Sequence, residues 1–133
     1  MAIIVLDTDV ASQIYKDRAA ESMISQLDGH TLCLTFVPVG EMTRWAEKRN
    51  WGTRQRTDLV RWIGNLAVLR YDIHMAARWG RVMAASDQRG RTRPEDDTWI
   101  AAICLEAGLP LATNNVKDFA DLVDHEGLEL VTA

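Results

Sequence analysis

Acidic side chains follow several apolar stretches of this chain, and their positions indicate chemistry at one edge of a sheet. Asp7 ends the apolar run 2–6, and Glu41 lies in a helix expected just after the second strand. Asp97 opens a helix after a basic loop, and Asp118 follows the fourth expected strand. Ligands of open α/β sheets bind at the carboxyl ends of the strands, so these acids are expected to converge there.

Converging carboxylates repel one another and lose hydration, and a hard divalent cation removes that problem. Magnesium takes oxygen ligands and keeps several of its waters, so a few carboxylates are enough to hold it. Zinc is not favoured, because the three histidines are scattered along the chain without ligand spacing. A proton shared among the acids is the other chemistry that fits such a cluster.

Each acid also has a simple structural explanation. Asp7 or Asp9 fits a helix N-cap, and Asp97 and Asp118 fit helix N-termini through the helix dipole. Glu41 is harder to explain in this way, because it falls between apolar residues of its helix. Singly the acids are better read as structural, whereas together with the charge distribution they favour a metal site.

Hydrophobic periodicity predicts the elements that must position these acids. Strands are expected at 2–6, 32–37, 66–69, 109–113 and 128–131. Helices are expected from a cap at Thr8 or Asp9, at 19–28, from Pro38 to a break at 51–52, at 53–64, at 73–87, at 95–107 and from 116. This alternation predicts one α/β domain over 1–133 with a mostly parallel sheet.

The charges are unevenly distributed. Residues 44–93 hold 12 of the 15 Lys and Arg residues and four of the 19 acids, which gives +8 there and −12 elsewhere. A basic middle with acidic ends indicates a bound polyanion in one part and a bound cation in another. Ordinary solvated helix surfaces are the other explanation of the basic residues.

The bulk composition is typical of a cytoplasmic globular protein. Hydrophobic residues make up 47% of the 133, and no apolar run approaches the length of a membrane span. No signal peptide is expected, since the chain opens directly on a strand pattern. Cys33 and Cys104 lie in apolar elements and are expected to be reduced core residues. Neither has an evident His partner, which argues against a cysteine nucleophile.

Four segments, in this order and spacing, resemble the PIN-domain family, and most closely the VapC-type toxin ribonucleases of type II toxin–antitoxin pairs. They are Leu6-Asp7-Thr8-Asp9-Val10, Phe36-Val37-Pro38-Val39-Gly40-Glu41-Met42, Asp97-Thr98-Trp99-Ile100-Ala101-Ala102 and Leu111-Ala112-Thr113-Asn114-Asn115-Val116-Lys117-Asp118-Phe119. The resemblance covers nearly the whole chain. It implies a three-layer α/β/α sandwich around the central sheet.

The resemblance also implies a metal site for Mg²⁺ or Mn²⁺. Asp7, Glu41 and Asp97 match the family's metal-binding catalytic acids. A fourth catalytic position falls on Asp118, with Asn115 standing in the same region. The residues expected to support this site are Asn115, Thr113, Thr8, Asp9 and Asp96.

The activity implied is metal-dependent hydrolysis of RNA phosphodiester bonds, in tRNA or another structured RNA, without a covalent intermediate. The ion would generate the nucleophile and stabilise charge on the phosphate. Glu41 would ligate the ion or orient the attacking water. Arg89, Arg91 and Arg93, in the loop before Asp97, would hold the RNA backbone; a solvated loop is their other explanation.

Relatives of this kind pair as homodimers and are silenced by a small antitoxin, so a VapB-type partner and a heterotetramer or larger complex are expected, without a membrane. A groove formed by Ile14, Tyr15 and Trp45 would suit a partner helix. Base stacking on Trp45 and Trp51 is one explanation for the five tryptophans. Core or interface packing is the favoured explanation for most of them.

Two other functions fit parts of the pattern. Asp7-Thr8-Asp9 after an apolar strand resembles the nucleophile motif of haloacid-dehalogenase-like phosphatases, but the late acids open a helix where that family ends a strand. A PIN-like module that binds RNA or an antitoxin without cutting is the non-enzyme alternative. It requires that the acids fail to converge.

Overall fold

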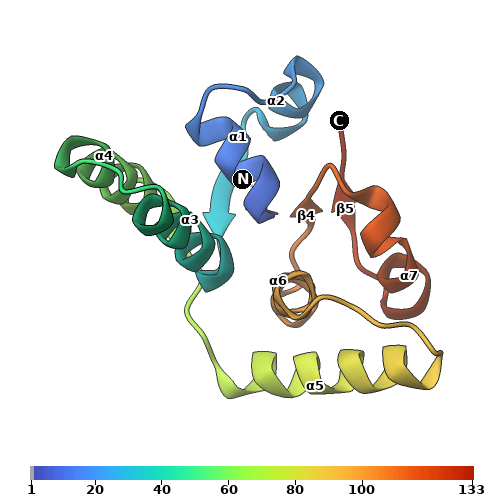
Figure 1. Ribbon diagram of the computed structural model, residues 1–133. Coiled ribbons are helices and arrows are strands. Elements are labelled where there is room, and N and C mark those ends of the chain that lie inside the picture. Colours follow the sequence, from blue (N-terminus) through green and yellow to red (C-terminus); the bar gives the residue numbers. More distant parts are fainter. Residues whose placement is uncertain (1) are drawn as a thin grey trace.

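A computed structural model describes residues 2–133 as alternating strands and helices (Figure 1). The strands are β1 (Ile3–Leu6), β2 (Thr31–Leu34), β3 (Ala67–Val68), β4 (Leu111–Ala112) and β5 (Leu130–Val131). The helices are α1 (Thr8–Tyr15), α2 (Glu21–Leu27), α3 (Phe36–Lys48), α4 (Thr53–Gly64), α5 (Ile73–Gln88), α6 (Glu95–Ala107) and α7 (Val116–Glu126).

The five strands form one parallel sheet in the order β3-β2-β1-β4-β5. The central strand β1 pairs with β2 through Val5 and Cys33 and with β4 through Val5 and Leu111. Val5 and Leu6 are completely buried, as a strand covered on both faces requires. The predicted α/β fold with a parallel sheet is therefore confirmed.

Side chains alternate along the strands and divide the core into two layers. Ile4, Leu6 and Leu34 pack with α1, α2, α3 and α4. Val5 and Cys33 face the opposite layer, where they pack with α5, α6 and α7. Figure 1 shows α1 and α2 on one side of the sheet and α5 and α6 on the other. This is the three-layer arrangement that the resemblance implied.

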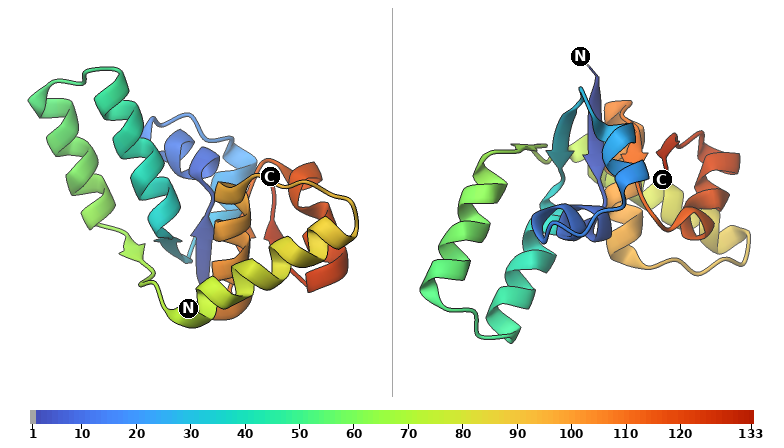
Figure 2. Two further views of the ribbon diagram at one scale, coloured as in Figure 1. Left: turned by 60° about the horizontal axis from the view of Figure 1, so that its bottom comes forward. Right: turned by 90° about the horizontal axis from the view of Figure 1, so that it is seen from above.

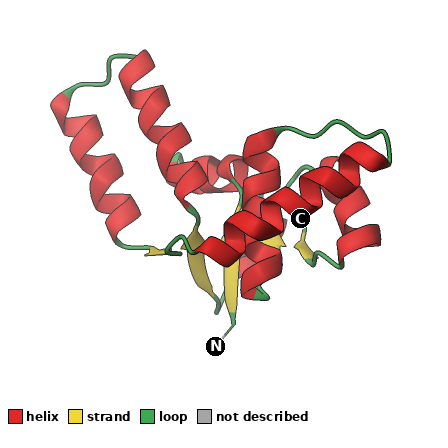
Figure 3. Ribbon diagram, turned by 90° about the horizontal axis from the view of Figure 1, so that it is seen from below, coloured by secondary structure: helices red, strands yellow, loops and turns green. Residues whose placement is uncertain are grey.

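Helices account for most of the chain, and the strands between them are short (Figure 3). The hairpin of α3 and α4 extends away from the sheet in both views of Figure 2. Tyr15 of α1 packs against this hairpin: its ring stacks on Trp51, in the turn that joins α3 and α4, and meets the edge of Trp62 near the end of α4. Trp79 of α5 stacks on Trp99 of α6 with ring centroids 4.8 Å apart. These tryptophans are packing residues, as the sequence favoured.

Two predicted boundaries are wrong for a common reason, which is side-chain capping. Residues 36–37 were expected in the second strand, but the Thr35 hydroxyl accepts from the Val37 N–H and starts α3 there. For the start of the first helix, Thr8 or Asp9 was expected as the cap, with capping also considered as an explanation of Asp7; Asp7 is the N-cap. When the side chain of the residue after a strand accepts a hydrogen bond from a backbone N–H two or three residues later, that residue becomes a helix N-cap. The strand then ends there and the helix begins at the next residue.

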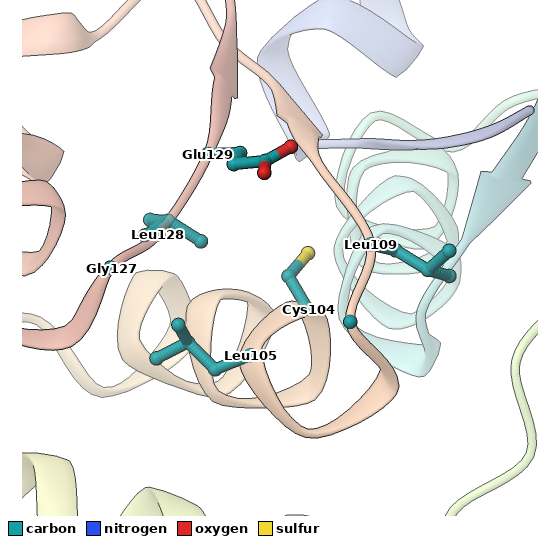
Figure 4. Close-up of a pocket in the computed structure, with 7 residues that line it drawn as sticks. Cys104, Leu105, Leu109, Gly127, Leu128 and Glu129 are labelled. Carbon is teal, nitrogen blue, oxygen red and sulfur yellow. The ribbon is translucent and has the colours of Figure 1, made fainter.

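Cys33 and Cys104 are free and buried, as predicted for core residues. Cys104 lines a small cavity of about 110 Å³ at the end of α6 beside Leu109 and Leu128 (Figure 4). None of the residues lining that cavity is a histidine, and burial raises the pKa of the Cys104 thiol far above its usual range. A buried protonated thiol without a base is not a nucleophile.

Among residues 2–133, no helix has both the length and the apolar character needed to cross a lipid bilayer.

Candidate active site

Acidic side chains from separate elements line one cavity of about 270 Å³ at the carboxyl edge of the sheet. Asp7 follows β1, Glu41 lies in the second turn of α3, and Asp97 lies in the first turn of α6. The lining residues are Asp7, Thr8, Asp9, Glu41, Trp45, Asp96, Asp97 and Asn115. The predicted convergence is observed, while the catalytic roles of these residues stay predictions.

Asp7 is fixed on both of its carboxylate oxygens. Its Oδ1 accepts from the Val10 N–H at 2.8 Å, and its Oδ2 accepts from the Thr113 hydroxyl at 2.5 Å. Burial raises the pKa of Asp7, and the bonds from Thr113 and Val10 partly oppose that rise. Thr113 also accepts from the Asn115 N–H at 2.9 Å, so β4 and the start of α7 are tied to the acid. The Asp7 side chain thus caps α1 and is at the same time part of the candidate site.

Glu41 reaches the cavity from α3 and is held from the opposite element. The Thr8 hydroxyl donates to Glu41 Oε1 at 2.7 Å. Burial is the main cause that raises the pKa of Glu41, the Thr8 bond lowers it, and the charge of Asp96 raises it further. Thr8 therefore orients a carboxyl that is easier to protonate than one in water.

Asp97 has the most strongly shifted carboxyl of the group. Burial, followed by the charges of Asp96, Asp7, Asp118 and Glu41, raises the pKa of Asp97 to about 6. Four other acids thus act on this side chain through space. Such a cluster favours a bound cation or a bound proton near neutral pH.

The donor set fits a hard divalent cation. Every charged group in the cavity wall is a carboxylate, and the neutral donors are hydroxyl and amide oxygens. Within residues 2–133, the side chains do not form a ready-made group of three acidic, His or Cys ligands. Because Asp7 is committed to two hydrogen bonds, this arrangement suits an ion that keeps much of its water rather than a fully enclosed one.

Of the two residues expected at the fourth position, Asn115 and Asp118, only Asn115 is among the residues that line the cavity. It caps α7 and lines the cavity, whereas Asp118, one turn later, is exposed and is not part of the wall. Asp118 acts on the site at longer range, through its charge on Asp97. Asp9 and Asp96 both line the cavity, and their supporting role stays a prediction.

The prediction that Arg89, Arg91 and Arg93 together hold RNA needs correction. Arg93 has only 5% of its side chain exposed; it pairs with Asp121 at 3.1 Å and donates to the Asp118 carbonyl at 2.6 Å. Arg89 pairs with the same Asp121 at 2.6 Å. Two of the three arginines thus anchor their own loop to α7, and Arg91 alone is exposed.

The groove expected from Ile14, Tyr15 and Trp45 is not a single surface. Trp45 lines the acidic cavity, whereas Ile14 lines a separate cavity with Ile24 and Leu27. Tyr15 is taken up by the tryptophans around it. The place of Trp45 in the acidic wall was missed, although it lies four residues after Glu41 and hence on the same helix face.

The shifted pKa of Asp97 predicts a pH-dependent stability. The folded pKa of about 6 lies above the usual 3.8, so the folded state binds more protons between these values and stability falls as pH rises through them. An asparagine at this position carries no ionisable carboxyl, so Asp97→Asn should not lose stability as the pH rises through this range. We expect the metal-free variant to be more stable than the parent at pH 7 by about 1–2 kcal/mol, after allowance for solvent screening.

Urea unfolding in EDTA at a series of pH values between about 4 and 7 measures this difference. The advantage of Asp97→Asn should shrink toward pH 4, where the folded carboxyl is protonated and the unfolded one, with its usual pKa of 3.8, is about half protonated. Asp87→Asn, at an exposed position near the end of α5, is the matched control and should show no such trend. An equal gain at every pH would mean that the carboxyl charge is not its cause.

Comparison with known proteins gives one consistent result. The family model described as PIN domain matches residues 4–124. Ribonuclease VapC2 of Haemophilus influenzae is 29% identical over 120 residues, covering 89% of this chain and 90% of that protein. The tRNA(fMet)-specific endonuclease VapC of Shigella flexneri is 27% identical, covering 86% and 87%. A chain in the crystal structure of VapBC2 from Rickettsia felis bound to promoter DNA superposes with a TM-score of 0.84 at 17% identity, covering 98% of each chain.

Proposed function

The chain belongs to the PIN-domain family, and from that membership we propose that it is a metal-dependent endoribonuclease, the toxin of a VapBC-type toxin–antitoxin pair. The observation that carries the proposal is the cavity that brings Asp7, Glu41 and Asp97 together at the carboxyl edge of the sheet. Relatives named VapC ribonucleases support the reaction, since this chain spans about nine-tenths of their length.

Mg²⁺ or Mn²⁺ is the proposed cofactor. When bound, such an ion supplies a water of lowered pKa and neutralises charge on the phosphate. Asp7 and Asp97 would hold it, directly or through water. Asp7 enters that role with its position fixed by the Val10 and Thr113 hydrogen bonds, so little rearrangement is needed on binding.

Glu41 is the residue proposed to orient the attacking water and to accept its proton. Its raised pKa makes it a stronger base than an exposed glutamate, and the Thr8 hydroxyl holds one carboxylate oxygen in place. Asn115 would contribute a neutral polar group to the same wall. No side chain needs to form a covalent intermediate for this hydrolysis.

RNA is the proposed substrate, with tRNA favoured because one relative is named a tRNA(fMet)-specific endonuclease. A VapB-type antitoxin is the proposed partner, since similar folds occur in solved VapBC complexes. A homodimer, joined with antitoxin into a heterotetramer or larger complex, is the proposed assembly. The phosphatase alternative loses its basis, because Asp97 lies inside a helix rather than at the end of a strand.

Cleavage of total cellular RNA by the purified, antitoxin-free protein tests the activity and its metal requirement. We expect cutting at discrete sites with Mg²⁺ or Mn²⁺ and none with EDTA, and we expect addition of the metal in excess to restore it. Size-exclusion chromatography and circular dichroism in EDTA are the control that checks whether the protein stays folded without metal. Failure of the folded protein to cut with either metal would favour the non-cleaving binding module instead.

A further inference from the structure

Two cations lie over the ring of Trp45. The Lys16 ammonium is 5.6 Å from the ring centroid, and the Arg49 guanidinium carbon is 6.0 Å from it. Lys16 is the C-cap of α1 and Arg49 is the C-cap of α3. The two cations therefore come from different helices, and both contact the Trp45 ring. Both side chains are exposed, and neither is paired with a carboxylate in the part of the chain that is described.

The ring that holds these cations belongs to the wall of the acidic cavity. Trp45 lines it together with Asp7, Glu41 and Asp97, and it lies one helical turn after Glu41 on α3. Lys16 and Arg49 are themselves outside that wall, each about two helical turns along its helix from Thr8 and Glu41 respectively, and they adjoin the wall through the Trp45 ring. A cluster of acids on its own repels RNA, so cations are needed next to it.

Two of the three loop arginines are engaged elsewhere, and Arg91 alone is exposed. Arg93 is buried, and Arg89 is paired with Asp121. Lys16 and Arg49 are exposed to solvent, and the aromatic face restricts the conformations of these two long side chains. Side chains ordered before binding lose less entropy when they take up a phosphate.

We propose that Lys16 and Arg49, positioned by Trp45, form a subsite for RNA backbone phosphates that flank the cleavage site on the Trp45 side of the cavity. The inference rests on the proposed endoribonuclease function and deepens it. Lys16 and Arg49 contact phosphate and contribute affinity without reading sequence. Trp45 is a positioning residue that acts through the two cations.

The test measures binding of fluorescein-labelled bulk tRNA by anisotropy in EDTA, where no cleavage occurs, over about 50 to 200 mM salt. We expect the double variant Lys16→Gln/Arg49→Gln to bind about tenfold more weakly at low salt. Its slope of log Kd against log salt should fall by about 1.4–1.8, since each lost phosphate contact removes about 0.7–0.9. Arg81→Gln, at an exposed arginine of α5, is the matched control and should change neither quantity beyond the loss of general charge.

Trp45→Leu keeps both charges but removes the ring, and we expect it to lower affinity while leaving the salt slope close to that of the parent. In cleavage with metal, the double variant should raise KM and keep kcat, because backbone contacts away from the reacting atoms bind substrate and transition state alike.

The outcomes separate this inference from the function on which it rests. If the parent binds and cuts RNA while the double variant keeps its affinity and salt slope, the subsite is wrong and the endoribonuclease stands. If the parent neither binds nor cuts RNA, both are wrong. If the double variant binds RNA normally but loses an acidic peptide or the antitoxin, the two cations serve a protein partner, and the inference is overturned.

Discussion

Replacing Asp7 by asparagine is expected to reduce metal-dependent RNA cleavage by about 10²–10³-fold, the scale on which loss of one preorganised electrostatic group acts. The asparagine side chain would keep an oxygen that can accept from the Val10 N–H and so preserve the helix cap. It would lose the charge that the cation needs. The measurement is kcat/KM on a tRNA substrate with Mg²⁺, beside thermal unfolding of both proteins.

Asp7→Ala separates the two duties of this side chain. It removes the cap as well as the charge, so we expect the same loss of activity together with a loss of about 1–2 kcal/mol in the free energy of unfolding. Cleavage by Asp7→Asn at the parent's rate, in a protein of unchanged stability, would remove Asp7 from the metal site and leave it as a helix cap alone.

Replacing Arg93 by methionine is expected to lower the free energy of unfolding by about 3 kcal/mol. Arg93 is nearly fully buried, and its loss leaves Asp121, whose side chain is only 9% exposed, with Arg89 and a long contact to His125. The same change breaks the bond to the Asp118 carbonyl. Urea unfolding at pH 7 measures this loss of stability. The expected loss is at the lower end of the values known for broken buried ion pairs, because Asp121 keeps its pair with Arg89.

Activity should fall together with stability, because Arg93 ties the loop that precedes α6 to the first two turns of α7. That link fixes Asp97 relative to Asn115 across the cavity. Arg91→Met, two residues away and exposed, is the control and should cost little stability. If both variants lose equal stability, burial of the Arg93 charge is not what stabilises the loop.

The sequence alone determined the sheet and the identity of the acids at its edge. Apolar runs such as 2–6 admit few places other than a buried strand, and their alternation with helical patterns specifies parallel connections. Once the strands are parallel, residues that follow them must meet at one edge. Asp7, Glu41, Asp97 and Asp118 could therefore be expected near one edge from their order along the chain. The resemblance to the PIN-domain family singled out the first three, and these three line the cavity.

Only the tertiary structure decided which charges are free and which are engaged. Arg89 and Arg93 look like RNA ligands in the sequence, but their partner Asp121 lies 28 or more residues away and becomes a neighbour only when α7 packs beside the loop. The reverse holds for the two cations at the Trp45 ring, which nothing in the sequence singled out as a pair. Lys16 and Arg49 reach one ring only because α1 and α3 pack together. Local patterns fix backbone geometry over a few residues, whereas the pairing of side chains depends on contacts between elements distant in the chain, which no local pattern encodes.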